Sequence, residues 1–192
     1  DKLGLIIKNK NDMKKLLFIG MSVFFMHSIS FAKWPSNVKI VEGVQKDSIM
    51  VAGNLADGKI MEDLSWAANS SNACFVSFQN PKFRGNHVFF ATSILPHTEL
   101  IISVKPDDET ANLSLYAYMM GADSYNLVPN LSSCITCEAD YKWDRPWKGK
   151  TQNSERYVNF NNPTGKPFNI LIGVSSPVGI SEGAFKVKIK TK

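Results

Sequence analysis

Residues 184–190, with the sequence AFKVKIK, decide the fold class of this protein. In this stretch apolar residues at 185, 187 and 189 alternate with lysines at 186, 188 and 190. Successive side chains of a β-strand point to opposite faces, so the alternation predicts a strand with one face in a core and one in water. The stretch therefore predicts a half-buried sheet at the end of the chain.

Short β-rich runs of the same kind recur along the chain, separated by Gly, Pro and Asn turns. No segment after residue 32 shows a sustained helical period with caps. About eight to ten strands at short spacing predict an all-β fold, an antiparallel β-sandwich or jelly roll. The other runs are residues 38–44, 48–53, 63–67, 73–78, 87–94, 99–104, 112–119 and 168–174.

Residues 13–32 read as a secretory signal peptide. Two lysines follow Met13, residues 16–26 (LLFIGMSVFFM) form an uncharged apolar segment, and residues 30–32 (SFA) give an A-x-A-like cleavage site. We expect this leader to be helical, residues 1–12 to be an upstream extension that is not native, and residues 33–192 to form a single domain. The apolar core is about half the length of a membrane span. The protein is therefore expected to be secreted or periplasmic, without stable membrane insertion after cleavage.

The leader also accounts for much of the positive charge. Five of the 22 basic and two of the 17 acidic residues precede Lys33, which leaves 17 basic and 15 acidic residues and a net charge of +2. A charge this close to zero requires neither nucleic acid nor an anionic membrane as a partner. We therefore expect no nucleic-acid binding.

Three late segments resemble the bacterial pre-peptidase C-terminal domain, a secreted β-sandwich. They are residues 112–118 (NLSLYAY), 167–174 (PFNILIGV) and 182–187 (EGAFKV). The resemblance implies a non-catalytic accessory or binding module. Asn112 stands where that family usually has an aspartate, which weakens the implication of a calcium site.

Cys134 and Cys137 form a C-x-x-C motif, and Cys74 is the third cysteine. In an oxidising compartment the first expectation is a structural Cys134–Cys137 disulfide. A bond from Cys74 to either residue is the rival pairing. Two other readings stay open: a thiol/disulfide protein that uses Cys134 and Cys137, and a metal site that adds His87 or His97 to the three cysteines.

Residues for enzyme catalysis or calcium binding are weaker candidates than the cysteines. The chain has no nucleophile, zinc-protease or phosphate-loop motif, and carboxylate pairs such as Glu62–Asp63 would point to opposite faces of a strand. We expect no enzyme activity, although a hydrolase without a recognisable motif is the third reading. No cofactor is expected either; calcium, at the carboxylates of residues 107–109, is the one ion considered.

Residues 121–153 contain no convincing strand and are expected to form a long loop, which is often functional in compact domains. The loop concentrates aromatic and charged side chains of the kind that glycan- and protein-binding surfaces use. We predict that it contacts a glycan or another exported protein, and that the protein is an exported, non-catalytic binding or accessory module. The predicted ligand-binding residues are Tyr141, Trp143, Asp144, Arg145 and Trp147.

Overall fold

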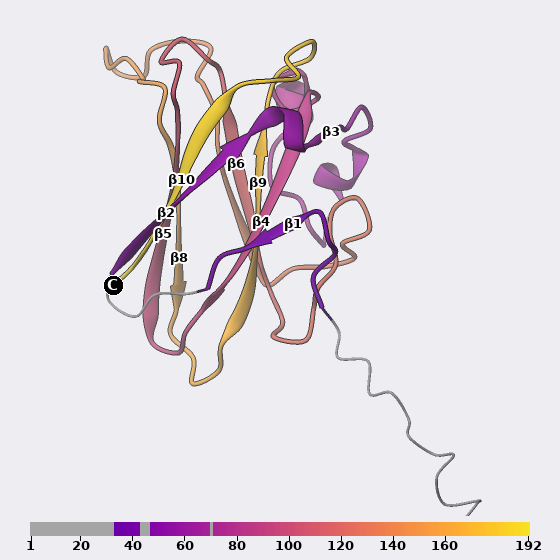
Figure 1. The fold of residues 1–192 in the computed structure, drawn as a ribbon, viewed down its shortest axis with the longest axis vertical. Helices are drawn as coiled ribbons and strands as arrows, with labels where there is room; N and C mark the ends of the chain where they lie inside the picture. The colour runs from indigo at the N-terminus through magenta and orange to yellow at the C-terminus, as the bar shows by residue number, and fades with distance from the viewer. Residues whose placement is uncertain (1–32, 43–46, 70) are drawn as a thin grey trace, which may run out of the picture. The chain divides into compact units, whose positions relative to one another are not determined.

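The computed structural model describes residues 33–42, 47–69 and 71–192. The predicted upstream extension and signal peptide lie outside the described residues. Ten strands form two sheets of mostly antiparallel strands, which confirms the predicted all-β sandwich (Figure 1). Within the described part of the chain, no helix is both long enough and apolar enough to span a membrane.

The first sheet, called sheet A, has the strand order β1-β4-β9-β6-β7, and β3 also pairs with β4. β1 runs parallel to β4, and the other pairs of this sheet are antiparallel. Its strands are β1 (Val38–Ile40), β3 (Lys59–Ile60), β4 (Asn86–Ile94), β6 (Ser114–Met120), β7 (Thr136–Asp140) and β9 (Phe168–Ser175).

The second sheet, called sheet B, has the order β2-β10-β5-β8, and all its pairs are antiparallel. The strand that carries AFKVKIK, β10, lies between β2 and β5 and alternates between buried and exposed residues, as the sequence predicts. The strands are β2 (Ser48–Asn54), β5 (Thr98–Pro106), β8 (Arg156–Asn162) and β10 (Ala184–Thr191).

The main core lies between the two sheets, where the inward side chains of both sheets meet. Full burial of each large apolar side chain stabilises the fold by about 1.5–3 kcal/mol. The core includes Phe90, Ile94, Leu100, Ile102, Leu115, Phe160, Ile172 and Phe185.

A second apolar layer covers the outer face of sheet A. It contains two 3-10 helices, η2 (Ser65–Ala68) and η3 (Ser77–Lys82), and a further short helix, η1 (Leu55–Asp57), precedes β3. All seven residues of β6 are buried, because the strand has a packed layer on each face. Tyr116 can lie flat against β9 because Gly173 is there: a Cβ on Gly173 would fall 2.1 Å from the Tyr116 ring.

Two predicted strands are absent for a physical reason. Residues 63–67 and 73–78 belong to this covering layer and form turns and 3-10 helix instead of strands. Side chains of these residues, such as Trp66 and Phe75, pack against Tyr116 on the outer face of sheet A. The alternation of residues 73–78 therefore does not indicate a strand here.

Three observed strands escaped the sequence analysis: the two-residue strand β3, β7 and β8. β7 lies within residues 121–153, so the expectation that this region lacks a strand is wrong for residues 136–140. β8 alternates between buried and exposed residues along its whole length, but its three asparagines have low strand propensity. The irregular segment is consequently divided by β7 into residues 121–135 and 141–155.

Candidate functional site

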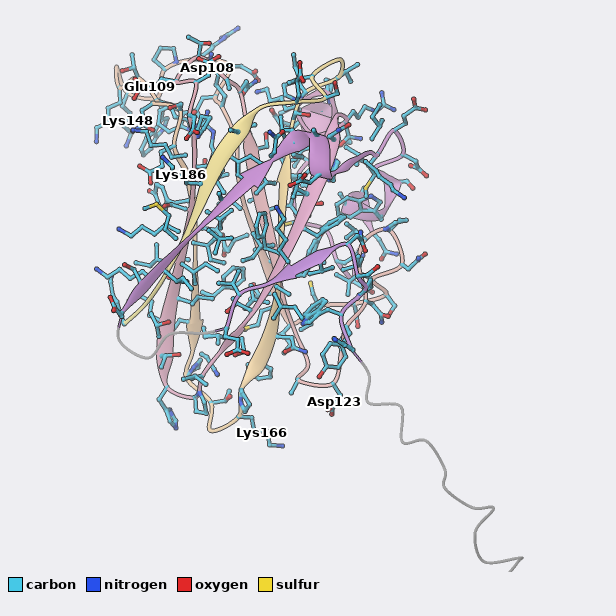
Figure 2. All side chains as sticks on the ribbon, in the orientation of Figure 1. Asp108, Glu109, Asp123, Lys148, Lys166 and Lys186 are labelled. Atoms are coloured by element: carbon cyan, nitrogen blue, oxygen red, sulfur yellow. The ribbon has the colours of Figure 1, made fainter. Side chains whose placement is uncertain are left out.

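The loop between β7 and β8, residues 141–155, carries all the predicted ligand-binding residues. It lies at the end of the sandwich where β8 begins, and Lys148 of the loop appears at the same end as Asp108 and Glu109 (Figures 1 and 2). A tight turn forms its tip: Lys150 donates its N–H to the carbonyl of Trp147 at 2.9 Å. Lys148 (φ 48°) and Gly149 (φ 73°) are both left-handed, as in a two-residue hairpin turn.

One part of this loop is fixed to the covering layer. Lys82 Nζ donates to Asp144 Oδ1 at 2.5 Å and to the carbonyl of Lys142 at 2.8 Å, and lies 5.5 Å from the Tyr141 ring. Tyr141 packs edge-on against Phe83 with ring centroids 5.6 Å apart. The hydrogen bond from Lys82 lowers the pKa of Asp144, so this carboxylate stays ionised. Tyr141 and Asp144 therefore help to hold the loop in place, although Asp144 is exposed and Tyr141 is half-buried; that they bind a ligand stays a prediction.

Gln152 fixes the other side of the same loop. Its Oε1 accepts the N–H of Trp143 at 2.7 Å, and its Nε2 donates to the carbonyl of Tyr141 at 3.1 Å and to Asp140 Oδ1 at 3.4 Å. Asp140 Oδ2 accepts the N–H of Tyr157 at 2.9 Å. Burial raises the pKa of Asp140, although the hydrogen bond from Tyr157 and the charge of Arg156 partly oppose the shift. The loop thus has a defined conformation at its base.

The rest of the loop faces solvent. Trp143 is 38% and Trp147 is 58% exposed, and Arg145 is exposed beside them. Lys148 Nζ lies 4.5 Å from the centre of the Trp147 ring. Between residues 142 and 150 four cationic side chains accompany one carboxylate, Asp144, which is paired with Lys82. The exposed surface therefore combines two indole rings with excess positive charge.

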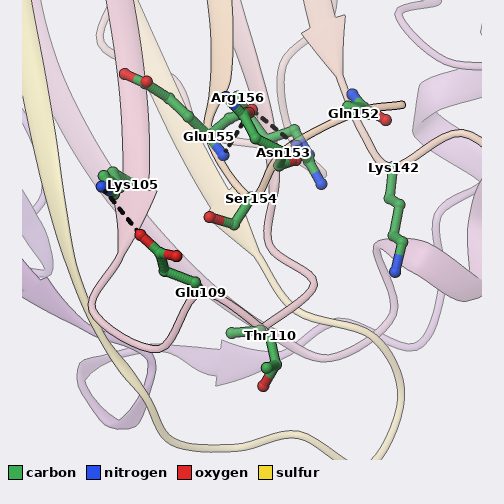
Figure 3. A pocket seen from close by; sticks show the side chains of 10 residues that line it. Lys105, Glu109, Thr110, Lys142, Gln152, Asn153, Ser154, Glu155 and Arg156 are labelled. Atoms are coloured by element: carbon green, nitrogen blue, oxygen red, sulfur yellow. Dashed lines mark hydrogen bonds and ion pairs between the residues drawn. The ribbon is translucent and has the colours of Figure 1, made fainter. Parts of the chain in front are cut away.

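A polar cavity of about 270 Å³ lies beside this loop, between the β5–β6 turn and the start of β8 (Figure 3). Lys142 and Gln152 belong both to the loop and to the wall of the cavity. Arg156, the first residue of β8, also lines it although its side chain is almost completely buried. The complete lining is Lys105, Glu109, Thr110, Ala111, Lys142, Gln152, Asn153, Ser154, Glu155 and Arg156.

Sequence analysis did not single out this cavity. The signal that could have found it is the alternation of residues 156–162, which places residues 156, 158, 160 and 162 on the buried side. An arginine in an inward position of a strand is rare and needs a reason. The β5–β6 turn, which supplies the opposite wall, is brought there only by tertiary folding.

The expected disulfide is not present. Cys74, Cys134 and Cys137 are all free thiols, so the predicted Cys134–Cys137 bond is wrong. Cys137 Sγ instead donates to the carbonyl of Ala73 at 3.1 Å, and Cys134 Sγ lies 3.6 Å from the carbonyl of Ser71. The strand β7 and the segment before it are attached to residues 71–74 by hydrogen bonds, not by a covalent link.

The surroundings of the thiols oppose redox chemistry. A hydrogen bond with Cys137 and burial raise the pKa of Cys74 far above its usual range. Burial raises the pKa of Cys134 to about 11. Reactive cysteines have lowered pKa values, because the thiolate is the nucleophile. In the region that the structure describes, no three His, Cys, Asp or Glu side chains are grouped to hold a metal ion.

The two histidines outside the leader have different environments. His97 is exposed, whereas His87 is buried between the Phe83 carbonyl, which faces its Nε2, and the Tyr116 hydroxyl, 2.7 Å from its Nδ1. Nε2 donates to the carbonyl, so Nδ1 accepts from the hydroxyl and the ring is neutral. Burial lowers the pKa of His87 to about 4. This histidine is a structural part of the covering layer.

The carboxylates of residues 107–109 each have a neighbouring donor. Asp108 Oδ1 accepts from the N–H and the hydroxyl of Thr110, which lowers its pKa. Asp107 lies 3.5 Å from Lys186, and Glu109 lies 3.4 Å from Lys105. The run therefore forms a solvated turn with local ion pairs, and calcium binding there stays a prediction.

No family model matches this chain, and no curated protein does. Several solved structures resemble it weakly, with low identity and TM-scores below 0.5. The pre-peptidase C-terminal domain of a collagenase from Bacillus anthracis is 10% identical, with a TM-score of 0.42, over 83% of this chain and 100% of that one. PliG of Aeromonas hydrophila, a periplasmic inhibitor of g-type lysozyme, is 7% identical with a TM-score of 0.41, over 81% and 98% of the two chains.

A third similar structure is CorA, a surface-associated copper-binding protein of Methylomicrobium album BG8. It is 7% identical, with a TM-score of 0.39, and the match covers 81% of this chain and 98% of that one. The resemblance to the pre-peptidase C-terminal domain, first seen in the sequence, thus recurs in the structure as a weak likeness of fold. At this level of overlap we take nothing about function from these proteins.

Proposed function

We propose that this protein is an exported, non-catalytic binding module that holds a saccharide chain on the β7–β8 loop. The observation that carries the proposal is the exposure of Trp143 and Trp147 on a loop whose base is fixed by hydrogen bonds. An indole ring offers a flat apolar face and loses little conformational entropy on binding. Its natural complement is the flat CH-rich face of a pyranose ring.

The charged groups of the loop suit the remaining part of such a ligand. Arg145 and Lys142 are exposed donors without a carboxylate partner among the described ion pairs. Donors of this kind orient hydroxyl groups at the edge of the stacked rings. Exported protein partners are the other class that the sequence allows, and they form one arm of the test below.

Binding is favoured over catalysis by the state of the titratable groups near the loop. Asp140 and Asp144 both accept hydrogen bonds that hold the loop, and His87 is buried in the covering layer. A general acid or base must reach the reacting group of a substrate. The thiol alternative loses support because the pKa values of Cys74 and Cys134 are raised.

The proposal is tested by screening the chain from residue 33 against an array of neutral and acidic oligosaccharides, with a pull-down of exported proteins in parallel. The Trp143→Ala/Trp147→Ala variant should weaken saccharide binding about 30-fold or more, as expected when ligand-contacting aromatics are removed. The matched control is Ile60→Ala/Val178→Ala, which removes two exposed apolar side chains from a different pocket.

Circular dichroism should give the same folded spectrum for both variants and the parent chain. Retention of every ligand by the double tryptophan variant would refute the proposal. If the chain captures an exported protein and binds no saccharide on the array, the partner is a protein and not a glycan.

A further inference from the structure

Arg156 carries a buried charge that forms no ion pair among the described residues. Its side chain is 1% exposed, yet its three hydrogen bonds go to neutral carbonyls. Nε donates to Leu113 at 3.1 Å, and Nη1 donates to Asn153 and Glu155, each at 2.7 Å. None of the ion pairs in the described part of the chain includes Arg156.

One carboxylate, Asp140, attracts this charge but forms no ion pair with it. Asp140 lies close enough to influence the guanidinium, but its two oxygens accept from Gln152 and from the N–H of Tyr157. Burial lowers the pKa of Arg156, as expected for a cation with incomplete compensation. A charge buried without a partner is costly, and proteins normally pair it.

The hydrogen bonds of Arg156 explain part of its role but not its charge. Its Nε and Nη1 groups hold three backbone carbonyls at the start of β8. The described hydrogen bonds of the side chain use Nε and Nη1, and Nη2 is not among the buried polar atoms that lack a partner, so it is accessible from the cavity. Arg156 lines the polar cavity beside the loop, so an occupant of that cavity would meet the uncompensated side of the guanidinium.

The other walls of the cavity carry charges of both signs. Glu109 is paired with Lys105 at 3.4 Å and Glu155 is a second acidic residue, whereas Lys142 belongs to none of the described ion pairs. Lys105 and Lys142 stand on opposite sides of it, with Thr110 at its lower edge and Arg156 at its upper edge in Figure 3. Ser154 and the amides of Gln152 and Asn153 supply neutral hydrogen-bonding groups. Its volume of about 270 Å³ is near the lower limit for ligand pockets, about 300 Å³, which favours one sugar unit over a longer segment.

We propose that this cavity is the subsite for a uronic acid unit, so that the glycan held by the β7–β8 loop is an acidic polysaccharide. The sugar carboxylate meets Arg156 and Lys142, while the ring hydroxyls meet the neutral groups and the Lys105–Glu109 pair. Lys142 adjoins Trp143, so one chain can occupy the cavity and stack on the indole. The inference rests on the proposed function and adds the class of ligand.

The test is isothermal titration calorimetry of the chain from residue 33 with tetragalacturonate. The matched ligand is the same tetrasaccharide with its carboxylates reduced to alcohols. The charged ligand should bind at least tenfold more tightly, and the preference should shrink with added salt because the charges are screened. A peptide of four aspartates, the third ligand, should bind at least tenfold more weakly than tetragalacturonate.

Substitutions of cavity residues test whether the preference for the charged tetrasaccharide arises in the cavity. Arg156→Gln removes the buried charge, and because it can also disturb the start of β8, Lys142→Gln provides a second test on an exposed side chain. Each should reduce the preference for the charged tetrasaccharide about fivefold or more. The control is Lys166→Gln, at the opposite end of the sandwich from Asp108 and Glu109 (Figure 2), which should leave it unchanged.

Three results would overturn the subsite. Equal affinity for the charged and reduced tetrasaccharides would show that the carboxylate is not recognised, and the proposed function would be unaffected. Equal affinity for the aspartate peptide replaces the sugar by an acidic protein segment. If neither tetrasaccharide binds, the cavity is not a subsite for uronic acid. The proposed function is then decided by the array and the tryptophan variant.

Discussion

The two outer faces of this sandwich are built in opposite ways. The outer face of sheet B is open to water, and β10 exposes three lysines on it. The outer face of sheet A is covered by η2, η3 and the segments around them, so that β6 is buried on both faces. A half-buried strand has an alternating sequence, whereas a strand covered on both faces does not need one.

This difference also places the candidate site. The covering layer supplies Lys82 and Phe83, which fix the β7–β8 loop through Asp144 and Tyr141. A loop at the end of an uncovered sheet would lack these contacts. The exposed tryptophans are therefore presented by a scaffold that only the covered face provides.

The two faces should differ most in how much one substitution on each lowers the free energy of unfolding. Phe83 is fully buried in the covering layer and stacks on Phe75 with centroids 4.0 Å apart. Phe83→Ala should lower the free energy of unfolding by about 3–5 kcal/mol. Lys188→Ala, on the open face, should change it by no more than about 0.5 kcal/mol. Urea denaturation measures both, and a similar loss in the two variants would contradict the comparison.

The stability of the covering layer should also depend on pH, because it contains the buried His87. Its pKa of about 4 in the folded protein lies below the ordinary value of 6.5, so the unfolded chain binds this proton first as the pH falls. The stability is fully present above pH 6.5 and should decline by up to about 3 kcal/mol as the pH falls to about 4.

His87→Gln should flatten that decline in urea titrations at several pH values. The control His97→Asn alters an exposed histidine with φ 54°, a conformation that asparagine tolerates, and should keep the decline. A parent-like decline in His87→Gln would show that another group carries the pH dependence.

The smallest stability effect is expected where the loop joins the scaffold. Gln152→Ala removes the three hydrogen bonds that connect Asp140, Tyr141 and Trp143, and should cost about 1–2 kcal/mol. Hydrogen exchange should rise in residues 141–150 and stay unchanged in β10. Asn161→Ala, an exposed change on β8, is the control. Unchanged exchange in the loop of Gln152→Ala would mean that other contacts hold it.

The sequence predicted the parts of the molecule that obey a local pattern. The strand β10 and the sandwich class follow from alternation that any half-buried sheet imposes. The covering layer was missed because residues 73–78 alternate like a strand, whereas their packing on the outer face of sheet A gives irregular chain and the start of a 3-10 helix. Trp143 and Trp147 were singled out by composition, and their role in binding stays a prediction. Arg156 was not, because its significance depends on the cavity that the β5–β6 turn closes from far along the chain.

The most direct measurement of the central claim is a nuclear magnetic resonance titration of the indole N–H groups with a saccharide ligand. The chain has four tryptophans: Trp143 and Trp147 are exposed on the loop, Trp66 is buried with its Nε1 bonded to Met61 Sδ, and Trp34 packs edge-on against Tyr125. We expect the signals of Trp143 and Trp147 to shift together with the ligand concentration and those of Trp66 and Trp34 to stay in place. A saturating shift confined to Trp34, or binding that leaves both loop signals unmoved, would contradict the account.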